Sequence, residues 1–114
     1  MVKLEDQRYL GLFEEALSDW NFDGYIVWKR RPTEWLEEEI EGFTTKAVGK
    51  LMYEHFKNGG KIDQVKETRH PYDGMYEFHF DFRFPINGRK IYIETVLDET
   101  STGPTITVVN MHDE

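Results

Sequence analysis

The sequence predicts an α+β fold, with N-terminal helices packed on one face of a C-terminal, four-stranded, mainly antiparallel sheet. Three observations lead to this prediction. In the first half of the chain, apolar residues recur every three or four positions, as they do along an amphipathic helix. From residue 61 onward they alternate with polar residues, as they do along a strand. The pair Asn87-Gly88 then marks a hairpin between two of the strands.

The length and composition favour one globular domain over residues 1–114. Aromatic residues make up 15 % of the chain, which predicts a bulky core. Because there is no cysteine, disulfides, thiolate chemistry and cysteine-based metal sites are excluded. No apolar run approaches the roughly 18 residues of a membrane helix. The first residues, MVKLEDQRYL, lack the apolar stretch of a signal peptide. We therefore expect a cytoplasmic protein without a membrane partner.

The net charge of −8 argues against sequence-independent binding to nucleic acid, which relies on lysine and arginine. The charge is uneven along the chain. Residues 1–41 hold 11 acidic and 5 basic residues, a net charge of −6. Residues 46–92 hold 9 basic and 6 acidic residues, a net charge of +3. These numbers fit a locally basic face on an acidic protein, or an ordinary mixed surface.

Three segments are predicted to be helical, at residues 5–20, 33–41 and 45–57. Each carries apolar residues at steps of three and four. Thr33 and Gly42 are expected to cap the second helix. Thr44 or Thr45 begins the third helix, and Asn58-Gly59 ends it.

Two features of the helical half remain open at this point. Residues 25–28 have strand composition and are expected to be extended up to Pro32, but the sequence does not show whether they join the sheet. His55 lies at the edge of the apolar stripe of the third helix. We interpret it as a half-buried core histidine rather than a catalytic residue.

The strands are predicted at residues 61–68, 76–84, 89–97 and 104–112. A two-residue turn at Asn87-Gly88 fixes how the second strand pairs with the third. In that register Phe84 opposes Ile91 and Phe82 opposes Ile93. The phenylalanines of YEFHFDFRF therefore share one apolar face, which we expect to be the core.

The same register defines the other face of the hairpin. It places Asp81 opposite Glu94 and Arg83 opposite Tyr92, with His79 next to Asp81 on its strand. Adjacent carboxylates repel, so one pKa rises unless a cation or a metal ion intervenes. Such a costly arrangement favours a functional site. The alternative is a solvated sheet face whose charges pair with one another.

The last strand is apolar on both sides. Ile106, Val108, Asn110 and His112 point one way, and Thr107, Val109 and Met111 point the other way. Either set can face the core. With Thr107, Val109 and Met111 inward, Asn110 and His112 join the polar face.

The stretch GGKIDQVKETR…YEFHFDFRFPINGRKIYIETVL…TITVVNMHDE resembles, in its architecture over residues 44–112, the compact RelE-type ribonuclease toxins of bacteria. These belong to the Barnase–EndoU–Colicin–RelE group. In that group helices cover one face of the sheet and catalytic residues lie on the other. The resemblance implies a metal-independent endoribonuclease that acts on RNA and needs no cofactor. It includes no shared motif, so no residue role is transferred.

Cleavage of RNA by its 2′-hydroxyl needs a base, an acid and a cation for the phosphate. The candidate catalytic residues are His79, Asp81, Arg83, Tyr92, Glu94 and His112. His79 or Glu94 would act as the base and His79 or His112 as the acid. Arg83 would hold the phosphate, and Tyr92 would stack on a base or donate a proton. Lys66 and Arg69 are candidates for binding the RNA backbone.

Two other functions are compatible with the sequence. The first is a non-enzymatic interaction module, an inhibitor or a subunit of a small complex, with a cognate protein partner or a second copy of the chain. It would use the acidic residues 34–41, a free strand edge at residues 61–69, and three tryptophans expected to be exposed. These are Trp20, Trp28 and Trp35.

The second of these other functions is metal binding by His79, Asp81 and Glu94. Nucleotide-binding, zinc-protease and serine-hydrolase motifs are absent from the sequence.

Overall fold

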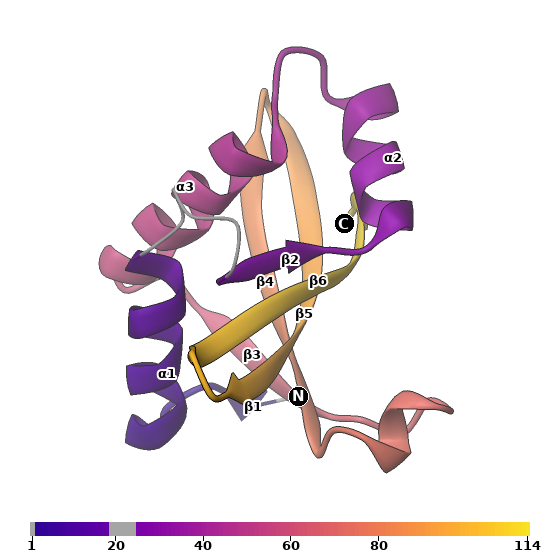
Figure 1. Ribbon diagram of the computed structural model, residues 1–114. Helices are drawn as coiled ribbons and strands as arrows, with labels where there is room; N and C mark the ends of the chain where they lie inside the picture. The colour runs from indigo at the N-terminus through magenta and orange to yellow at the C-terminus, as the bar shows by residue number, and fades with distance from the viewer. Residues whose placement is uncertain (1, 19–24) are drawn as a thin grey trace.

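The computed structural model describes residues 2–18 and 25–114. These residues form an α+β structure with three α-helices and a six-stranded mixed sheet (Figure 1). The helices are α1 (Gln7–Ser18), α2 (Arg30–Glu39) and α3 (Thr45–Lys57), and a short 3-10 helix, η1, spans Tyr72–Gly74. The strands are β1 (Val2–Lys3), β2 (Ile26–Trp28), β3 (Ile62–Lys66), β4 (Phe78–Ile86), β5 (Arg89–Thr100) and β6 (Gly103–Asp113). The predicted fold class is confirmed, but the sheet has two more strands than predicted.

The two extra strands lie at the edges of the sheet, whose order is β1-β3-β4-β5-β6-β2. β2 runs parallel to β6, so the segment at residues 25–28 does join the sheet. β1 pairs antiparallel with β3, where Val2 opposes Gln64 and Lys3 opposes Asp63. The free edge predicted at residues 61–69 is therefore partly covered. A strand of two residues is too short to show alternation, which explains why the sequence did not reveal it.

The helix ends agree with the prediction for α3 and differ from it for α2. Oγ1 of Thr44 accepts a hydrogen bond from the backbone N–H of Ala47 at 3.1 Å, so Thr44 is the N-cap of α3. α2 begins at Arg30, so Thr33 is not its cap and instead donates its hydroxyl to the Lys29 carbonyl at 2.9 Å. Pro32 therefore lies inside the first turn of α2, where a backbone N–H would have no helical acceptor.

The hairpin between β4 and β5 has the predicted register. Asn87 and Gly88 have φ values of 52° and 78°, as a type I′ turn requires. Phe82 opposes Ile93, and Asp81 opposes Glu94. The turn thus sends the phenylalanines to one face and the charged residues to the other.

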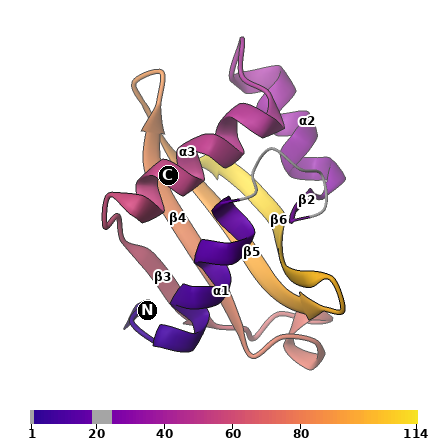
Figure 2. The same ribbon diagram turned by 60° about the vertical axis from the view of Figure 1, so that its left-hand side comes forward.

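The core lies between the sheet and the helices, and α1 and α3 cross the same face of the sheet (Figure 2). Phe13 of α1 meets Phe80 of β4 with ring centroids 5.1 Å apart. His55 is half-buried at the rim of this core and stacks on Phe84 at 5.4 Å, which agrees with its interpretation as a core residue. Trp28 and Trp35 are half-buried against the core, so they are only partly exposed. The third predicted tryptophan, Trp20, lies outside the described residues.

A β-bulge resolves the ambiguity of the last strand. Glu94 opposes Asn110, whereas its neighbour Thr95 opposes Val108, so Val109 is an extra residue in β6. Three residues of β6 are buried in the core: Ile106, Val108 and Met111. Asn110 and His112 consequently join the face of Glu94. Each predicted alternative is right for one half of the strand.

Candidate functional site

The sheet face opposite α1 and α3 carries charged side chains that are buried. We call it the polar face and define it by Asp63, Glu67, His79, Asp81, Arg83, Tyr92, Glu94 and His112. Five of these residues have at most 9 % of their surface exposed: Asp63, Glu67, His79, Asp81 and Glu94. Buried charges are costly unless they are paired. The alternative of a solvated face is therefore wrong for these five residues, although their charges do pair with one another as that alternative expected.

Strand pairing places three carboxylates in a row across the polar face. Asp63 of β3 opposes Asp81 of β4, and Asp81 opposes Glu94 of β5. Like charges directly opposite one another destabilise a sheet. Glu67 follows β3 and is held beside the same row by the hydrogen bond from its backbone N–H to the Glu77 carbonyl, at 2.9 Å.

A histidine lies among these carboxylates. Nδ1 of His79 is 2.8 Å from Oδ1 of Asp81, and its Nε2 is 3.7 Å from Oε2 of Glu67. The first distance is that of a hydrogen bond and the second is too long for one. When Nδ1 donates its proton to Asp81, Nε2 carries a free lone pair directed toward Glu67.

Two arginines pair with these acids: Arg69 with Glu67 and Glu94, and Arg83 with Asp63. Arg69 belongs to the connection between β3 and β4, and its Nη2 lies 3.2 Å from Oε2 of Glu67. The same guanidinium donates to both carboxylate oxygens of Glu94. About half of the Arg69 side chain remains exposed. We call Glu67, Arg69, His79, Asp81 and Glu94 the His79 cluster.

Arg83 and Tyr92 form a second group farther along the strands. Arg83 pairs with Asp63 and lies over the Tyr92 ring, with its Cζ 4.9 Å from the ring centroid. His112 stacks on Tyr92 from the neighbouring strand, at 4.7 Å between centroids. Since Arg83 and His112 flank Tyr92 on opposite strands, both faces of the ring are occupied. Tyr92 therefore does not offer a free face to a nucleobase in this arrangement.

The predicted acid and base pair His79 and His112 is not brought together. His112 is level with Tyr92 and Arg83, and Arg83 lies four residues beyond His79 on β4. Four residues of strand span about 13 Å. One phosphate group is too small to contact both imidazoles. Lys66 also lies away from this face, because it opposes Phe78 and points to the other side of the sheet.

Burial has the largest effect on the ionisation of the polar face. It raises the pKa of Asp81, against the opposing influence of the hydrogen bond with His79, while repulsion by Glu94 is a minor cause. Burial also raises the pKa of Tyr92, and the nearby charges of Asp81 and Glu94 add to the effect. Tyr92 thus keeps its proton, and its Oη lies 3.4 Å from Oε1 of Glu94.

One buried carboxylate oxygen of the His79 cluster has no hydrogen-bond partner. It is Oε1 of Glu67, whose side chain is fully buried. Oδ1 of Asp63 also lacks a hydrogen bond, but Nζ of Lys61 lies 3.4 Å away and compensates its charge. One ligand atom each from Glu67, His79 and Glu94 lies within 4.8 Å of the other two. These three residues could hold a metal ion.

Sequence reasoning found most of this cluster but missed Glu67. His79, Asp81, Glu94 and Arg69 are candidates from the sequence, and they do lie together. Glu67 was assigned only to a polar edge strand. Its alternation with Asp63 along the strand was visible, but the pairing of β3 with β4 was not, because no tight turn joins them.

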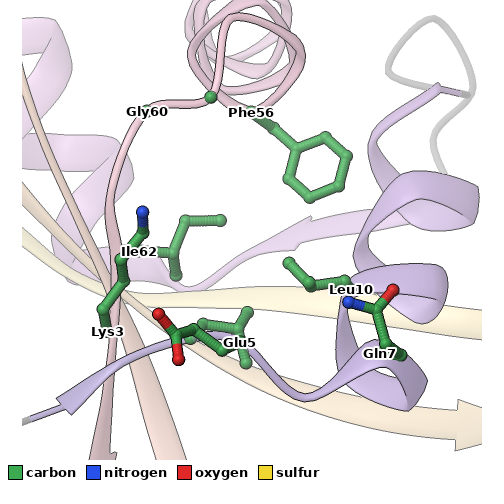
Figure 3. Close-up of a pocket in the computed structure, with 9 residues that line it drawn as sticks. Lys3, Glu5, Gln7, Leu10, Phe56, Gly60 and Ile62 are labelled. Atoms are coloured by element: carbon green, nitrogen blue, oxygen red, sulfur yellow. The ribbon is translucent and has the colours of Figure 1, made fainter.

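A cavity lies on the helix side of the sheet (Figure 3). It has a volume of about 460 Å³ and lies between the segment after β1, the start of α1 and the end of α3. Leu10, Phe56 and Ile62 provide apolar walls, and Lys3 and Glu5 lie at its rim. It contains none of the residues of the polar face.

Comparison with known proteins adds no assignment: no family model matches the chain, and neither the curated proteins nor the solved structures give a significant match. In residues 2–18 and 25–114, each helix is too short or too polar to cross a membrane.

Proposed function

We propose that the protein binds a divalent transition-metal ion through Glu67, His79 and Glu94. The observation that carries the proposal is the buried Oε1 of Glu67, which has no hydrogen-bond partner, in a carboxylate whose other oxygen, Oε2, lies 3.7 Å from Nε2 of His79. A buried carboxylate oxygen without a donor is costly, and a bound cation would remove that cost.

The donor set fits this class of ion. Two carboxylates and one imidazole suit zinc, manganese or iron better than calcium, which prefers an all-oxygen shell. Ligand atoms of one tetrahedral zinc ion lie about 3.4 Å apart, given bonds of about 2.1 Å. The 3.7 Å between Nε2 of His79 and Oε2 of Glu67 is close to that spacing.

Asp81 contacts the proposed ligand His79 on the side of the ring away from the ion. Its carboxylate holds Nδ1 of His79 at 2.8 Å, which orients the ring so that Nε2 points at the ion. Carboxylates commonly fix metal-binding histidines in this way. Asp81 would therefore position His79 rather than bind the metal, which differs from the sequence-based ligand set of His79, Asp81 and Glu94.

Three protein ligands leave at least one coordination position open. An open position is typical of catalytic metal sites, in which a bound water becomes acidic enough to act as a nucleophile. The proposed chemistry is therefore metal-assisted hydrolysis on the polar face.

Calorimetric titration with Zn²⁺ and Mn²⁺ tests the site directly. We expect one ion per chain and a rise in melting temperature on binding. Glu67→Gln should weaken binding about 100-fold, because it removes one charged ligand. Glu99→Gln is the matched control, since Glu99 is an exposed carboxylate of β5 that pairs with Arg8. Equal affinities for the two variants would refute the site.

RNA cleavage is a second candidate function, favoured by the His79–Asp81 pair and Arg69 on the sheet face opposite α1 and α3. Incubating the protein with total RNA, with and without a chelator, separates two mechanisms. Cleavage in the chelator would support the metal-independent, RelE-like reaction. Cleavage that needs Zn²⁺ or Mn²⁺ would support metal-assisted hydrolysis. Loss of activity in His79→Ala, with activity kept in His55→Ala, would locate either reaction on the polar face. The interaction-module alternative stays a prediction.

A further inference from the structure

We propose that metal binding frees Arg69 and so converts the His79 cluster into a site for a phosphate group. This inference rests on the proposed metal site. It names the substrate class, a phosphate monoester or diester, and the order of binding, with the metal first and the phosphate second.

Arg69 occupies the position that a metal ion would need. Its guanidinium donates to Oε2 of Glu67 and to both oxygens of Glu94, two of the three proposed ligands. A metal ion bound by these carboxylates would compete with Arg69 for the same lone pairs. Arg69 therefore acts as a resident cation of the metal-free protein.

The structure allows Arg69 to leave without disturbing the ligands. Glu67 is held by its backbone hydrogen bond to Glu77, whereas Arg69 lies beyond that bond in the connection that leads to η1. About half of its side chain is already exposed. Rotation of this side chain would break the pairs with Glu67 and Glu94 and leave the strand pairing intact.

The charges explain why a phosphate needs the metal first. Without a metal, the carboxylates of Glu67, Asp81 and Glu94 outnumber the single guanidinium of Arg69. A phosphate would meet a negative site. A divalent ion would neutralise the excess negative charge and displace Arg69 from Glu67 and Glu94. The planar guanidinium of Arg69 would then lie beside the open coordination position of the ion.

A phosphate group has the geometry to bridge these two cations. One of its oxygens would bind the metal, and two others would accept parallel hydrogen bonds from the guanidinium. The buried, unpartnered Oε1 of Glu67, on which the metal site rests, shows that Arg69 does not satisfy every carboxylate oxygen of the cluster. The acidic polar face could in this way accept a phosphodiester that it would otherwise repel.

The experiment measures Mn²⁺ and inorganic phosphate separately on the full chain. Electron paramagnetic resonance reports Mn²⁺ uptake, and calorimetry reports phosphate binding to metal-free and Mn²⁺-loaded protein. We expect phosphate to bind at least tenfold more tightly to the loaded protein, and acetate to bind more weakly than phosphate. Arg69→Gln should keep or tighten Mn²⁺ binding, because the competitor is gone, and should weaken phosphate binding about tenfold. That factor corresponds to about 1.4 kcal/mol.

Two further variants distinguish loss of the Arg69 guanidinium from a general folding defect. Arg69→Lys keeps the charge but not the fork, so phosphate binding should weaken while Mn²⁺ binding stays within about twofold of the wild-type value. Arg89→Gln is the control, because Arg89 pairs with Asp113 and Glu39 away from the cluster, and both affinities should be unchanged.

The outcomes separate the two proposals. Absence of Mn²⁺ uptake by the wild-type protein would overturn the metal site and this inference together. Normal Mn²⁺ uptake with phosphate binding that is independent of the metal, or of Arg69, would overturn this inference and leave the metal site in place.

Discussion

Both faces of the sheet contain buried side chains, but these side chains differ in chemistry and in what surrounds them. On the helix face, Phe82 is fully buried beneath the helices. On the polar face, Asp81 and Glu94 are each 3 % exposed, and Glu94 pairs with the half-exposed Arg69. Burial of the first kind drives folding. Burial of the second kind costs desolvation that ion pairs repay incompletely. Burial of Phe82 and burial of Asp81 or Glu94 therefore have opposite consequences for stability, and the costly face is the candidate site.

The strongest way to test this contrast is truncation on the helix face. Phe82→Ala should lower the free energy of unfolding by about 3–5 kcal/mol, because it removes a fully buried ring and leaves a cavity. Urea unfolding followed by circular dichroism measures the change. Phe84→Ala serves as the comparison, since Phe84 is only half-buried, and its loss should be smaller. Equal losses would mean that the helix face does not dominate stability.

The hairpin turn keeps the two faces apart and provides the next test. Gly88 has a φ of 78°, so Gly88→Ala should cost about 1–2 kcal/mol in unfolding free energy. Asn87→Gly, which relieves a non-glycine residue at a φ of 52°, should be neutral to within about 0.5 kcal/mol. Thermal melts of both variants check this prediction. A Gly88→Ala variant as stable as the wild type would show that the turn is not required for the register.

Substitution on the polar face should act in the opposite direction. Glu67 is as buried as a core residue. Glu67→Gln, however, removes one negative charge from a group of neighbouring carboxylates and so lowers their mutual repulsion. In a chelator we expect the unfolding free energy to stay unchanged or to rise by up to about 1 kcal/mol. Chemical denaturation with and without Zn²⁺ measures the free energy of unfolding of both proteins. Zn²⁺ should stabilise the wild type more than the variant. A loss comparable to that of Phe82→Ala would remove the distinction between the faces.

The smallest effect concerns the pH dependence of a tyrosine outside the polar face. Tyr76 donates its hydroxyl to Oδ2 of Asp98 at 2.9 Å, and burial, followed by this hydrogen bond, raises the pKa of Tyr76 to about 12. The folded protein therefore holds this proton more tightly than the unfolded chain does. The resulting stabilisation is complete below pH 10 and is lost as the pH rises through about 12. Thermal melts from pH 9 to 12 should show a steeper decline for the wild type than for Tyr76→Phe. Parallel declines would contradict the prediction.

The sequence predicts the polar face well where a tight turn sets the register. Asn87-Gly88 joins β4 and β5 directly, so the pairing of Asp81 with Glu94 follows from local rules. Glu67 and Asp63 could not be placed in the same way, because the chain between β3 and β4 runs from residue 67 to 77 through η1. The carboxylates that pair with Arg69 and Arg83 could not be predicted from the sequence either. Arg69 comes from that connection, and its pairing depends on tertiary structure alone.

The helices show the same limit. Thr44 caps α3 through a hydrogen bond three residues away, which a local pattern can reveal. The start of α2 at Arg30 is different, because Pro32 both breaks helices and suits their first turn. Whether Pro32 ends a strand or lies in the first turn of a helix depends on β2. Its parallel pairing with β6 continues to Lys29, and α2 begins directly after that residue. Parallel pairing leaves no local signal.

The bulge in β6 bears on how this protein tolerates a change in length. Deletion of one residue from an inner strand normally reverses the facing of every side chain beyond it. Val109 is an exception, because it is the extra residue opposite Glu94 and Thr95. Without it, Val108 and Met111 would still point into the core, and Asn110 and His112 would still point to the polar face. A chain one residue shorter at this point would therefore keep both faces and lose only the local twist that a bulge adds.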